Sequence, residues 1–408
     1  MNFNSWTFVL FFLVVYAMVA PMRRYSTLHK WVLLLASWYF YASWNWQYLG
    51  LILFSTVFDY WVGLHFAKTL HPKRLITISV IGNLGVLAFF KYANFVITSA
   101  NDVAAAAGTA LHFSAIDVLL PVGISFYTFQ SMSYTIDVYR GELKPRRSLL
   151  DYALFIAFFP QLVAGPIVRA SEFFHELDHP KRIPWKETAY AITLIMFGFV
   201  KKVVFADSLA AATDPIWNNL SGSDPAAVLL AIYGFAFQIY FDFSGYTDIA
   251  IGIALLFGFR FPQNFNYPYI ATSLQEFWRR WHMTLSRWLR DYLYIALGGN
   301  RNGPTRTQVN LMLTMLLGGL WHGASWNFVI WGGIHGLWLA IERSLLFRIP
   351  GWQSNALGMR VFRWFLTFHL VCFAWIFFRA PDLASSLLVL DKLGDLFDAS
   401  AGLAALQM

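Results

Sequence analysis

The sequence predicts an all-α, polytopic integral membrane protein with about 10–12 transmembrane or re-entrant helices. Of its 408 residues, 58% are hydrophobic and only 13% are charged, well below the charged share that a soluble protein shows to water. The mean hydropathy is +0.51. The 18 Trp and 19 Tyr residues also favour a membrane–water interface. A chain of this composition cannot cover a water-facing surface with charge, and lipid removes that need.

Individual helices are predicted from apolar runs that are about 20 residues long and show no alternation typical of a β-barrel. The predicted spans are 6–22, 31–46, 48–66, 75–99, 117–138, 187–206, 226–243, 308–323, 326–346 and 361–379. The run 149–168 is also apolar, and 383–393 is a marginal candidate. The first run has no basic residue before it and no clear cleavage site, so we interpret it as an uncleaved helix.

The orientation of the helices is predicted from the distribution of Lys and Arg between them. Linkers 23–30, 67–74 and 139–147 are basic, which is typical of cytoplasmic loops. Linkers 100–116 and 207–225 contain neither Lys nor Arg and are expected to be external. This pattern places the N-terminus outside.

The apolar run 149–168 conflicts with a simple alternation of sides. Segment 175–186, with Lys181, Arg182 and Lys186, is as basic as the linker that precedes the run, so both flanks should be cytoplasmic. The run is interrupted by Pro160, Gly165 and Pro166. We therefore expect a re-entrant or broken segment, which is tolerated where protein or a water-filled cavity surrounds it. The alternative is a simple crossing that violates the charge rule.

The stretch 260–306 combines arginines with aromatic residues. Such a pattern is typical of amphipathic helices at the membrane interface, here expected at the cytoplasmic face. The net charge of +8 does not indicate a nucleic-acid partner, because the basic residues cluster in short linkers between apolar runs and serve as topology signals. Membrane lipid is the expected partner of such a surface.

His322 is a candidate general base. It follows an apolar run and precedes another, and sixteen helical residues from Arg306 would place it roughly 24 Å from the cytoplasmic edge. Ionisable groups at such depth are costly and usually functional. An imidazole titrates near neutrality, which suits a base. The alternative is a structural histidine that donates to a carbonyl.

His335 lies within the next predicted span. Gly332, Gly333 and Gly336 surround it and would let another helix approach closely. We expect a packed histidine at a helix interface more than a catalytic one.

A third group of polar residues falls in the segment Glu276–His282. Glu276 and Arg280 are four residues apart and can pair on a helix. Arg279, His282 and Arg290 could meet an anionic cofactor through a pantetheine or nucleotide phosphate. Contact with anionic lipid is the alternative.

Asp242 and Asp248 lie in an otherwise apolar region and could orient a histidine or bind a cation. A structural polar network is the alternative. The scattered histidines suggest no metal site, and the single cysteine, Cys372, cannot form an intramolecular disulfide.

Several of these segments together resemble the membrane-bound O-acyltransferase family, in the branch that contains alginate O-acetylase membrane subunits. The segments that carry the resemblance, in order, are Leu120–Phe126, Asp137–Gly141, Phe159–Pro160, Ala164–Pro166, Phe241–Asp248, Gly258–Pro262, Glu276–His282, Leu289–Tyr294, Gly298–Arg301 and Leu320–Gly323. The resemblance covers residues 1 to about 346, so we expect one acyltransferase domain over 1–408 with a motif core at about 117–346. It implies a ring of helices around a central funnel or tunnel.

The resemblance also implies roles for individual residues. His322 would be catalytic, and His282 would be a second functional histidine. The basic, aromatic character of the segment itself makes Arg279, Arg280, Trp281 and Arg290 the expected binding residues for the acyl donor. The resemblance and this basic segment together imply acetyl-CoA, as a substrate and not a resident cofactor.

The predicted activity is movement of an acetyl group from a cytoplasmic thioester across the membrane, for O-acetylation of an extracytoplasmic polysaccharide such as alginate. The expected partner is a periplasmic serine-hydrolase-like acetyltransferase or another polysaccharide-modification subunit. The expected location is the bacterial inner membrane. The alternatives are a D-alanyl or other acyl transferase of the same family, or a polytopic transporter.

Overall fold

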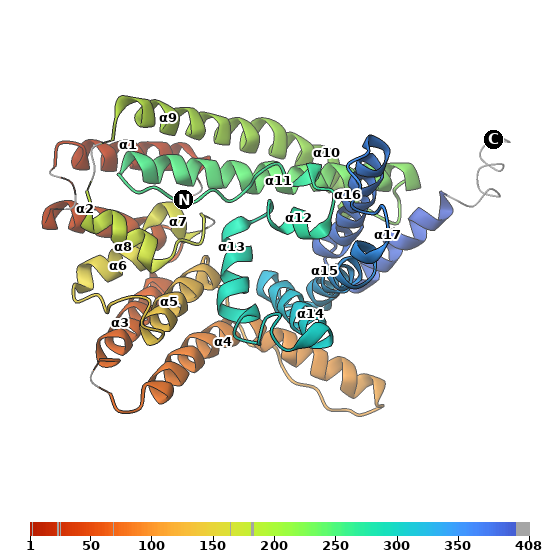
Figure 1. Cartoon of the computed structure of the whole chain (residues 1–408), viewed down its shortest axis with the longest axis horizontal. Helices are drawn as coiled ribbons and strands as arrows, with labels where there is room; N and C mark the ends of the chain where they lie inside the picture. The colour runs from red at the N-terminus through yellow and green to blue at the C-terminus, as the bar shows by residue number, and fades with distance from the viewer. Residues whose placement is uncertain are drawn as a thin grey trace. The chain divides into compact units, whose positions relative to one another are not determined.

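The computed structural model describes residues 1, 3–22, 24, 26–67, 69–163, 165–180 and 183–396. Every regular element in these ranges is a helix, which confirms the predicted all-α class (Figure 1). The chain forms two compact units. The first comprises Met1–Phe199 and Tyr246–Gln263, and the second comprises Val200–Gly245 and Asn264–Met408.

The first unit has a core rich in aromatic side chains. Its helices are α1 (Trp6–Val19), α2 (Thr27–Ala42), α3 (Leu49–His65), α4 (Pro72–Ala106), α5 (Ile124–Tyr139), α6 (Leu149–Ala157), α7 (Phe159–Leu162), α8 (Ala170–Asp178) and α9 (Trp185–Phe199). Helix α11 (Pro225–Leu256) contributes its last part to this unit. Phe155, Phe158 and Phe159 are fully buried, so the short helices α6 and α7 lie inside the unit.

The second unit contains the other helices and most of the motif residues. They are a π-helical segment (Val200–Ala206), α10 (Asp207–Asn218), the first part of α11, α12 (Leu274–Trp278), α13 (Met283–Trp288), a second π-helical segment (Leu289–Tyr294), α14 (Gly303–His322), α15 (Trp326–Ser344), α16 (Leu357–Arg379) and α17 (Leu383–Asp395). Helices α14 and α15 lie side by side (Figure 1).

Four helical stretches are long and apolar enough to cross a membrane: Pro72–Ala106, Trp185–Asn218, Pro225–Leu256 and Leu357–Arg379. Each covers a predicted span. Helices also occupy the other predicted spans, but α1, α2, α3 and α5 are shorter, at 14, 16, 17 and 16 residues. Large apolar side chains such as Trp6 and Leu230 are exposed, at 84% and 68%, as a lipid-facing surface requires. The chain is a polytopic membrane protein.

One predicted linker and one predicted span differ from expectation. Residues 207–225 are not a loop, because Asp207–Asn218 forms α10. The sequence Leu-Ala-Ala-Ala within it has high helix propensity, which outweighs the polar residues around it. The span predicted at 117–138 begins only at Ile124, after Gly123 with a φ of 75°.

The stretch 260–306 forms short helices joined by turns, and its predicted place at the membrane interface stays a prediction. Helices α12 and α13 have only five and six residues. The backbone takes a left-handed conformation at Tyr267, with a φ of 45°, and at His282, with a φ of 42°. Non-glycine residues rarely adopt this conformation, and each occurrence interrupts helical geometry. The basic and aromatic side chains therefore lie on short helical segments, of which α13 and the π-helical segment that follows it form one continuous run over 283–294.

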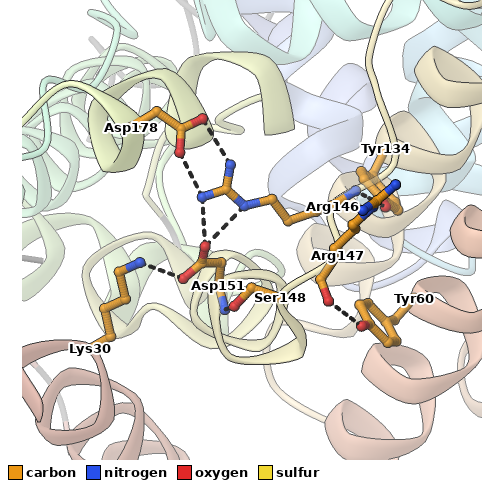
Figure 2. A network of polar contacts seen from close by, with 8 residues as sticks. All are labelled: Lys30, Tyr60, Tyr134, Arg146, Arg147, Ser148, Asp151 and Asp178. Atoms are coloured by element: carbon orange, nitrogen blue, oxygen red, sulfur yellow. Dashed lines mark hydrogen bonds and ion pairs between the residues drawn. The ribbon is translucent and has the colours of Figure 1, made fainter. Parts of the chain in front are cut away.

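A partly buried ion-pair network connects helices α2, α6 and α8 with the segment before α6, at one end of the first unit. Asp151, at the start of α6, accepts hydrogen bonds from Lys30 Nζ at 2.7 Å and from Arg146 at 2.6 Å (Figure 2). The same guanidinium donates to both carboxylate oxygens of Asp178, at the end of α8, at 2.7 and 2.8 Å. Tyr60, near the end of α3, donates to the Arg147 carbonyl at 2.6 Å.

The structure confirms that the run 149–168 is broken, and the network shows that the chain on either side of it lies together. Asp151 lies near the start of the run and Asp178 lies beyond its end, yet one Arg146 side chain contacts both. The chain therefore leaves and regains the same end of the unit and does not cross it once. The turn follows the break between α6 and α7 at Phe158, where ψ is 111°. Lys181 and Arg182, which contributed to the prediction, lie outside the described residues.

Candidate active site

Helices α14 and α15 approach closely, and glycines make this possible. A Cβ on Gly332 would collide with the carbonyl oxygen of Met315, and a Cβ on Gly336 would lie 2.8 Å from Met312 Sδ. On Gly333 the nearest atom would be 3.7 Å away, an ordinary contact. The predicted close approach is confirmed at Gly332 and Gly336, while Gly333 has room for a methyl group.

His322 is the last residue of α14 and is half-buried in an aromatic pocket. Its ring lies 4.9 Å from that of Trp321, 5.1 Å from that of Trp331 and 5.3 Å from that of Phe378, between ring centroids. Because α14 is one continuous helix from Gly303, the predicted rise of about 24 Å between Arg306 and His322 holds.

His282 lies close to the same pocket but is almost completely buried, at 1% exposed. Its Nδ1 lies 3.1 Å from Asn264 Oδ1, an oxygen that also accepts from the backbone N–H and hydroxyl of Thr284. An amide oxygen only accepts, so Nδ1 carries the hydrogen and Nε2 presents its lone pair. Nε2 has no partner among the described residues. Its ring centroid is 6.1 Å from that of Trp321, which also contacts His322.

His282 is electrically neutral. Burial lowers its pKa to about 3, because removal of water destabilises the imidazolium form. A neutral ring with Nδ1–H bound to Asn264 can accept a hydrogen bond at Nε2, and it cannot supply a positive charge for a phosphate.

A cavity of about 520 Å³ lies between α12, α13, α14 and α15. Its charged lining consists of Arg279, Arg287, Arg290, Arg343 and Glu342. Arg290 pairs with the neighbouring Asp291 at 2.6 Å. Four guanidinium groups still exceed the carboxylates of Glu342 and Asp291, so the cavity has a positive potential, which suits an anionic ligand with several phosphate oxygens. The remaining lining is largely apolar.

Glu342 fixes one wall of this cavity. Its carboxylate accepts hydrogen bonds from the backbone N–H groups of Leu274 at 2.6 Å and Gln275 at 3.1 Å. It therefore binds the N-terminus of α12, where amide groups have no partners within the helix. Helix α12 carries Trp278 to the cavity wall, so Glu342 positions that side chain from α15.

The comparisons with known proteins decide the family. A sequence model described as MBOAT, membrane-bound O-acyltransferase family, matches residues 142–379, a range that includes the cavity and both histidines. The chain belongs to the membrane-bound O-acyltransferase family. It is therefore an acyltransferase.

The relatives of this acyltransferase are named for O-acetylation or for D-alanyl transfer. "Probable alginate O-acetylase AlgI" of Azotobacter vinelandii is 46% identical over 94% of this chain and 76% of the relative. "Peptidoglycan O-acetyltransferase" of Helicobacter pylori is 38% identical over 95% of this chain and 79% of the relative. "Teichoic acid D-alanyltransferase" of Bacillus subtilis is 30% identical over 63% of this chain and 68% of the relative.

Only some of the predicted donor-binding residues of this acyltransferase line the arginine-lined cavity. Arg279 and Arg290 line the cavity, as does Trp278. Arg280 instead pairs with Glu276 at 2.8 Å, which confirms the predicted four-residue pairing even though α12 ends at Trp278. Trp281, at 2% exposed, packs in the aromatic core.

Sequence reasoning missed three lining residues as donor-site candidates, namely Arg287, Arg343 and Glu342. Arg287 belongs to the basic stretch and could have been included. Glu342 and Arg343 end the span that begins at Trp326, and an acidic residue at the end of an apolar helix is a usable signal.

Asp242 forms an ion pair with Lys202 at 2.5 Å, and Lys202 also pairs with Asp207 at 2.9 Å. Lys202 lies in the π-helical segment of a stretch long enough to cross the membrane. This arrangement agrees with the structural polar network that was the alternative for Asp242.

Proposed function

We propose that this acyltransferase transfers an acetyl group from acetyl-CoA, entering from the cytoplasm, to a hydroxyl group on the other side of the membrane. The observation that carries the proposal is the cavity with four arginines beside the α14–α15 pair, whose α14 ends in His322. The names of the relatives that match most of the chain support acetyl as the acyl group.

The donor would bind with its phosphates among Arg279, Arg287, Arg290 and Arg343. Guanidinium groups bind phosphate oxygens in a bidentate manner and remain charged at any physiological pH. Arg280 and Trp281 would act indirectly, since Arg280 is paired with Glu276 and Trp281 packs beneath this region.

His322 would act as the general base. Its imidazole takes the proton of the acceptor hydroxyl, whose oxygen attacks the thioester carbonyl carbon. The C–S bond then breaks, and the thiolate takes the proton back from the imidazolium to leave as a thiol. The aromatic rings around His322 exclude water, which limits hydrolysis of the thioester.

His282 would be the second functional histidine. Because its Nδ1–H is held by Asn264, its Nε2 lone pair can accept a hydrogen bond from a substrate hydroxyl. The neutral ring makes it an acceptor and not a binding group for donor phosphate.

We further propose that residues 1–408 work as one acyltransferase domain around a central tunnel in a bacterial inner membrane. The acceptor would be an extracytoplasmic polysaccharide such as alginate, reached directly or through a periplasmic serine-hydrolase-like acetyltransferase. The alginate O-acetylase relatives support this choice. D-alanyl transfer is the second candidate, and the teichoic acid relative, over a smaller part of the chain, supports it.

The test is acetyl release from acetyl-CoA by the full chain in proteoliposomes, with the acceptor glycan on the opposite side. His322→Ala should lower kcat by about 10²–10⁴-fold, the usual contribution of a general base. His369→Ala is the matched control, because His369 is half-buried on α16, hydrogen-bonds Phe365 of its own helix, packs against Tyr233 of α11 and does not line the arginine-lined cavity. Full activity of folded His322→Ala protein would refute the mechanism, and D-alanyl transfer without acetyl transfer would favour the second candidate.

A further inference from the structure

His335 on α15 is a buried histidine whose ring nitrogens are not satisfied by the fold. It is 1% exposed, and neither Nδ1 nor Nε2 has a hydrogen-bond partner among the residues that the structure describes. A neutral imidazole offers one donor and one acceptor. Burying both without partners costs free energy, so the position calls for a group that supplies them.

The surroundings of His335 are aromatic. Its ring centroid lies 4.7 Å from that of Trp331, 5.2 Å from that of Trp278 and 6.3 Å from that of Phe277. An aromatic face can accept an N–H group weakly, but it offers nothing to the imidazole lone pair. The indole N–H groups of Trp278 and Trp331 also have no acceptor within the described part of the chain. The cluster therefore presents three unmatched donors and one unmatched acceptor.

The cluster lies between the arginine-lined cavity and His322. Leu339 and Glu342 line the cavity, and His335 is one helical turn before Leu339 on the same face of α15. Trp331 lies one helical turn before His335, and its ring centroid is 5.1 Å from that of His322. Trp278 lines the cavity and also contacts His335. Side chains in contact thus connect the cavity with His322.

We propose that His335 is a binding residue for the pantetheine arm of the acyl donor, through one of the amide groups of that arm. The proposal rests on the proposed function. A secondary amide carries one N–H and one C=O, which match the acceptor and donor of the neutral imidazole. The arm joins the phosphates to the thioester, so it has to pass from the arginines to His322.

Two features of the cluster follow from this assignment. The indole of Trp278 lies against both the cavity and His335, which is not part of the cavity lining, so this indole has to shift for the arm to reach the imidazole. The unmatched indole N–H groups give further donors for amide carbonyls of the same arm. The arm is common to coenzyme A and to acyl carrier proteins, so both kinds of donor would use His335.

The kinetic test uses the full chain in proteoliposomes. His335→Phe keeps the ring volume and removes the unmatched nitrogens, so its melting temperature should stay the same or rise. Its KM for acetyl-CoA should rise about tenfold while kcat changes less. This is the expected effect when the lost hydrogen bond is equally strong in the bound ground state and in the transition state. His335→Gln, which keeps a donor and an acceptor, should recover part of the loss, and His369→Phe should leave KM unchanged.

Binding without turnover separates this inference from the proposed function. In His322→Ala protein, acetyl-CoA binding measured by calorimetry should weaken about tenfold when His335→Phe is added. An acetylated carrier protein as the probe should show the same weakening if it is the donor. A wild-type protein without acyl transfer, or an active His322→Ala variant, would refute the proposed function. Unchanged KM and unchanged binding in His335→Phe, or a clear loss of stability with unchanged KM, would overturn the assignment of His335 alone.

Discussion

At the scale of single residues, the two motif histidines differ in their surroundings. His322 is half-buried among aromatic rings at a helix end, whereas His282 is sealed in the core and bonded to Asn264. The sequence motif names both residues but does not distinguish them. His282 has a left-handed backbone conformation, and its ring lies beside Asn264. No local sequence pattern predicts this conformation.

Burial of His282 predicts a pH dependence of stability. Its pKa is about 3 in the folded protein and near 6.5 when unfolded, so the unfolded chain binds more protons between these values. The free energy of unfolding is therefore unaffected by His282 above pH 6.5, and it decreases as the pH falls from 6.5 toward 3. Between pH 7.5 and pH 5, His282 should cost the folded state about 2 kcal/mol of unfolding free energy.

The measurement is the melting temperature of detergent-solubilised protein at both pH values, for wild type and His282→Asn. The variant cannot titrate there, so its melting temperature should fall less between pH 7.5 and pH 5. Equal losses in both proteins would show that His282 is not the group responsible.

At the scale of elements, the α14–α15 pair shows how far a glycine pattern can be interpreted. The sequence indicates close packing from three glycines, but it cannot say which of them face the partner helix. Gly332 lies against Met315 and Gly336 against Met312, while Gly333 is beside Leu316 with space to spare. Adjacent residues on a helix point about 100° apart, which explains why Gly332 and Gly333 differ.

This difference provides a matched pair of variants. Gly332→Ala should destabilise the protein by about 1–3 kcal/mol, because the added methyl group meets backbone and pushes α14 away. It should also lower acyl transfer, since His322 ends α14. Gly333→Ala adds the same atom where there is room and should be neutral or slightly stabilising, because Ala favours helix.

Thermal unfolding and acyl-transfer rates of the two variants, measured side by side, check this prediction. Similar losses in both, or none in Gly332→Ala, would contradict the packing described for α14 and α15.

At the scale of the whole molecule, the charge pattern of the linkers predicted something that no single apolar run could. It required the segment 149–168 to be broken, and the Arg146 network confirms that the chain returns to one end of the first unit (Figure 2). The charge pattern did not give the lengths of the helices in stretch 260–306, because arginines and aromatic residues are equally compatible with long helices and with short ones.

The orientation can be tested by cysteine labelling. In a Cys372→Ser background, cysteines at Lys144 and His179 should react with an impermeant maleimide from the cytoplasmic side only. A cysteine at His112, in the linker without Lys or Arg, should react from the outside only. All three residues are exposed, so access depends on the side of the membrane.

Labelling of the Lys144 and His179 positions from opposite sides would mean that segment 149–168 crosses once, against the network of Arg146. Labelling of all three from the same side would refute the external assignment of linker 100–116.

The sequence by itself determined that this protein is surrounded by lipid, that its secondary structure is helical, and that it is an acyltransferase. Low charge requires lipid, apolar runs of spanning length require helices, and ordered motifs with His282 and His322 identify the acyltransferase. These properties depend on composition or on residues close together in the chain.

Only the tertiary structure decided which polar groups share a site. Glu342 binds the start of α12 from 68 residues away, and Arg343 joins Arg279 in one cavity while Arg280 turns to Glu276. Rings from α12 and α15 pack around His335, whose ring nitrogens have no hydrogen-bond partner in the described part of the chain. Such outcomes depend on contacts between distant segments, where a side chain's direction and burial are set by packing and not by its neighbours in sequence.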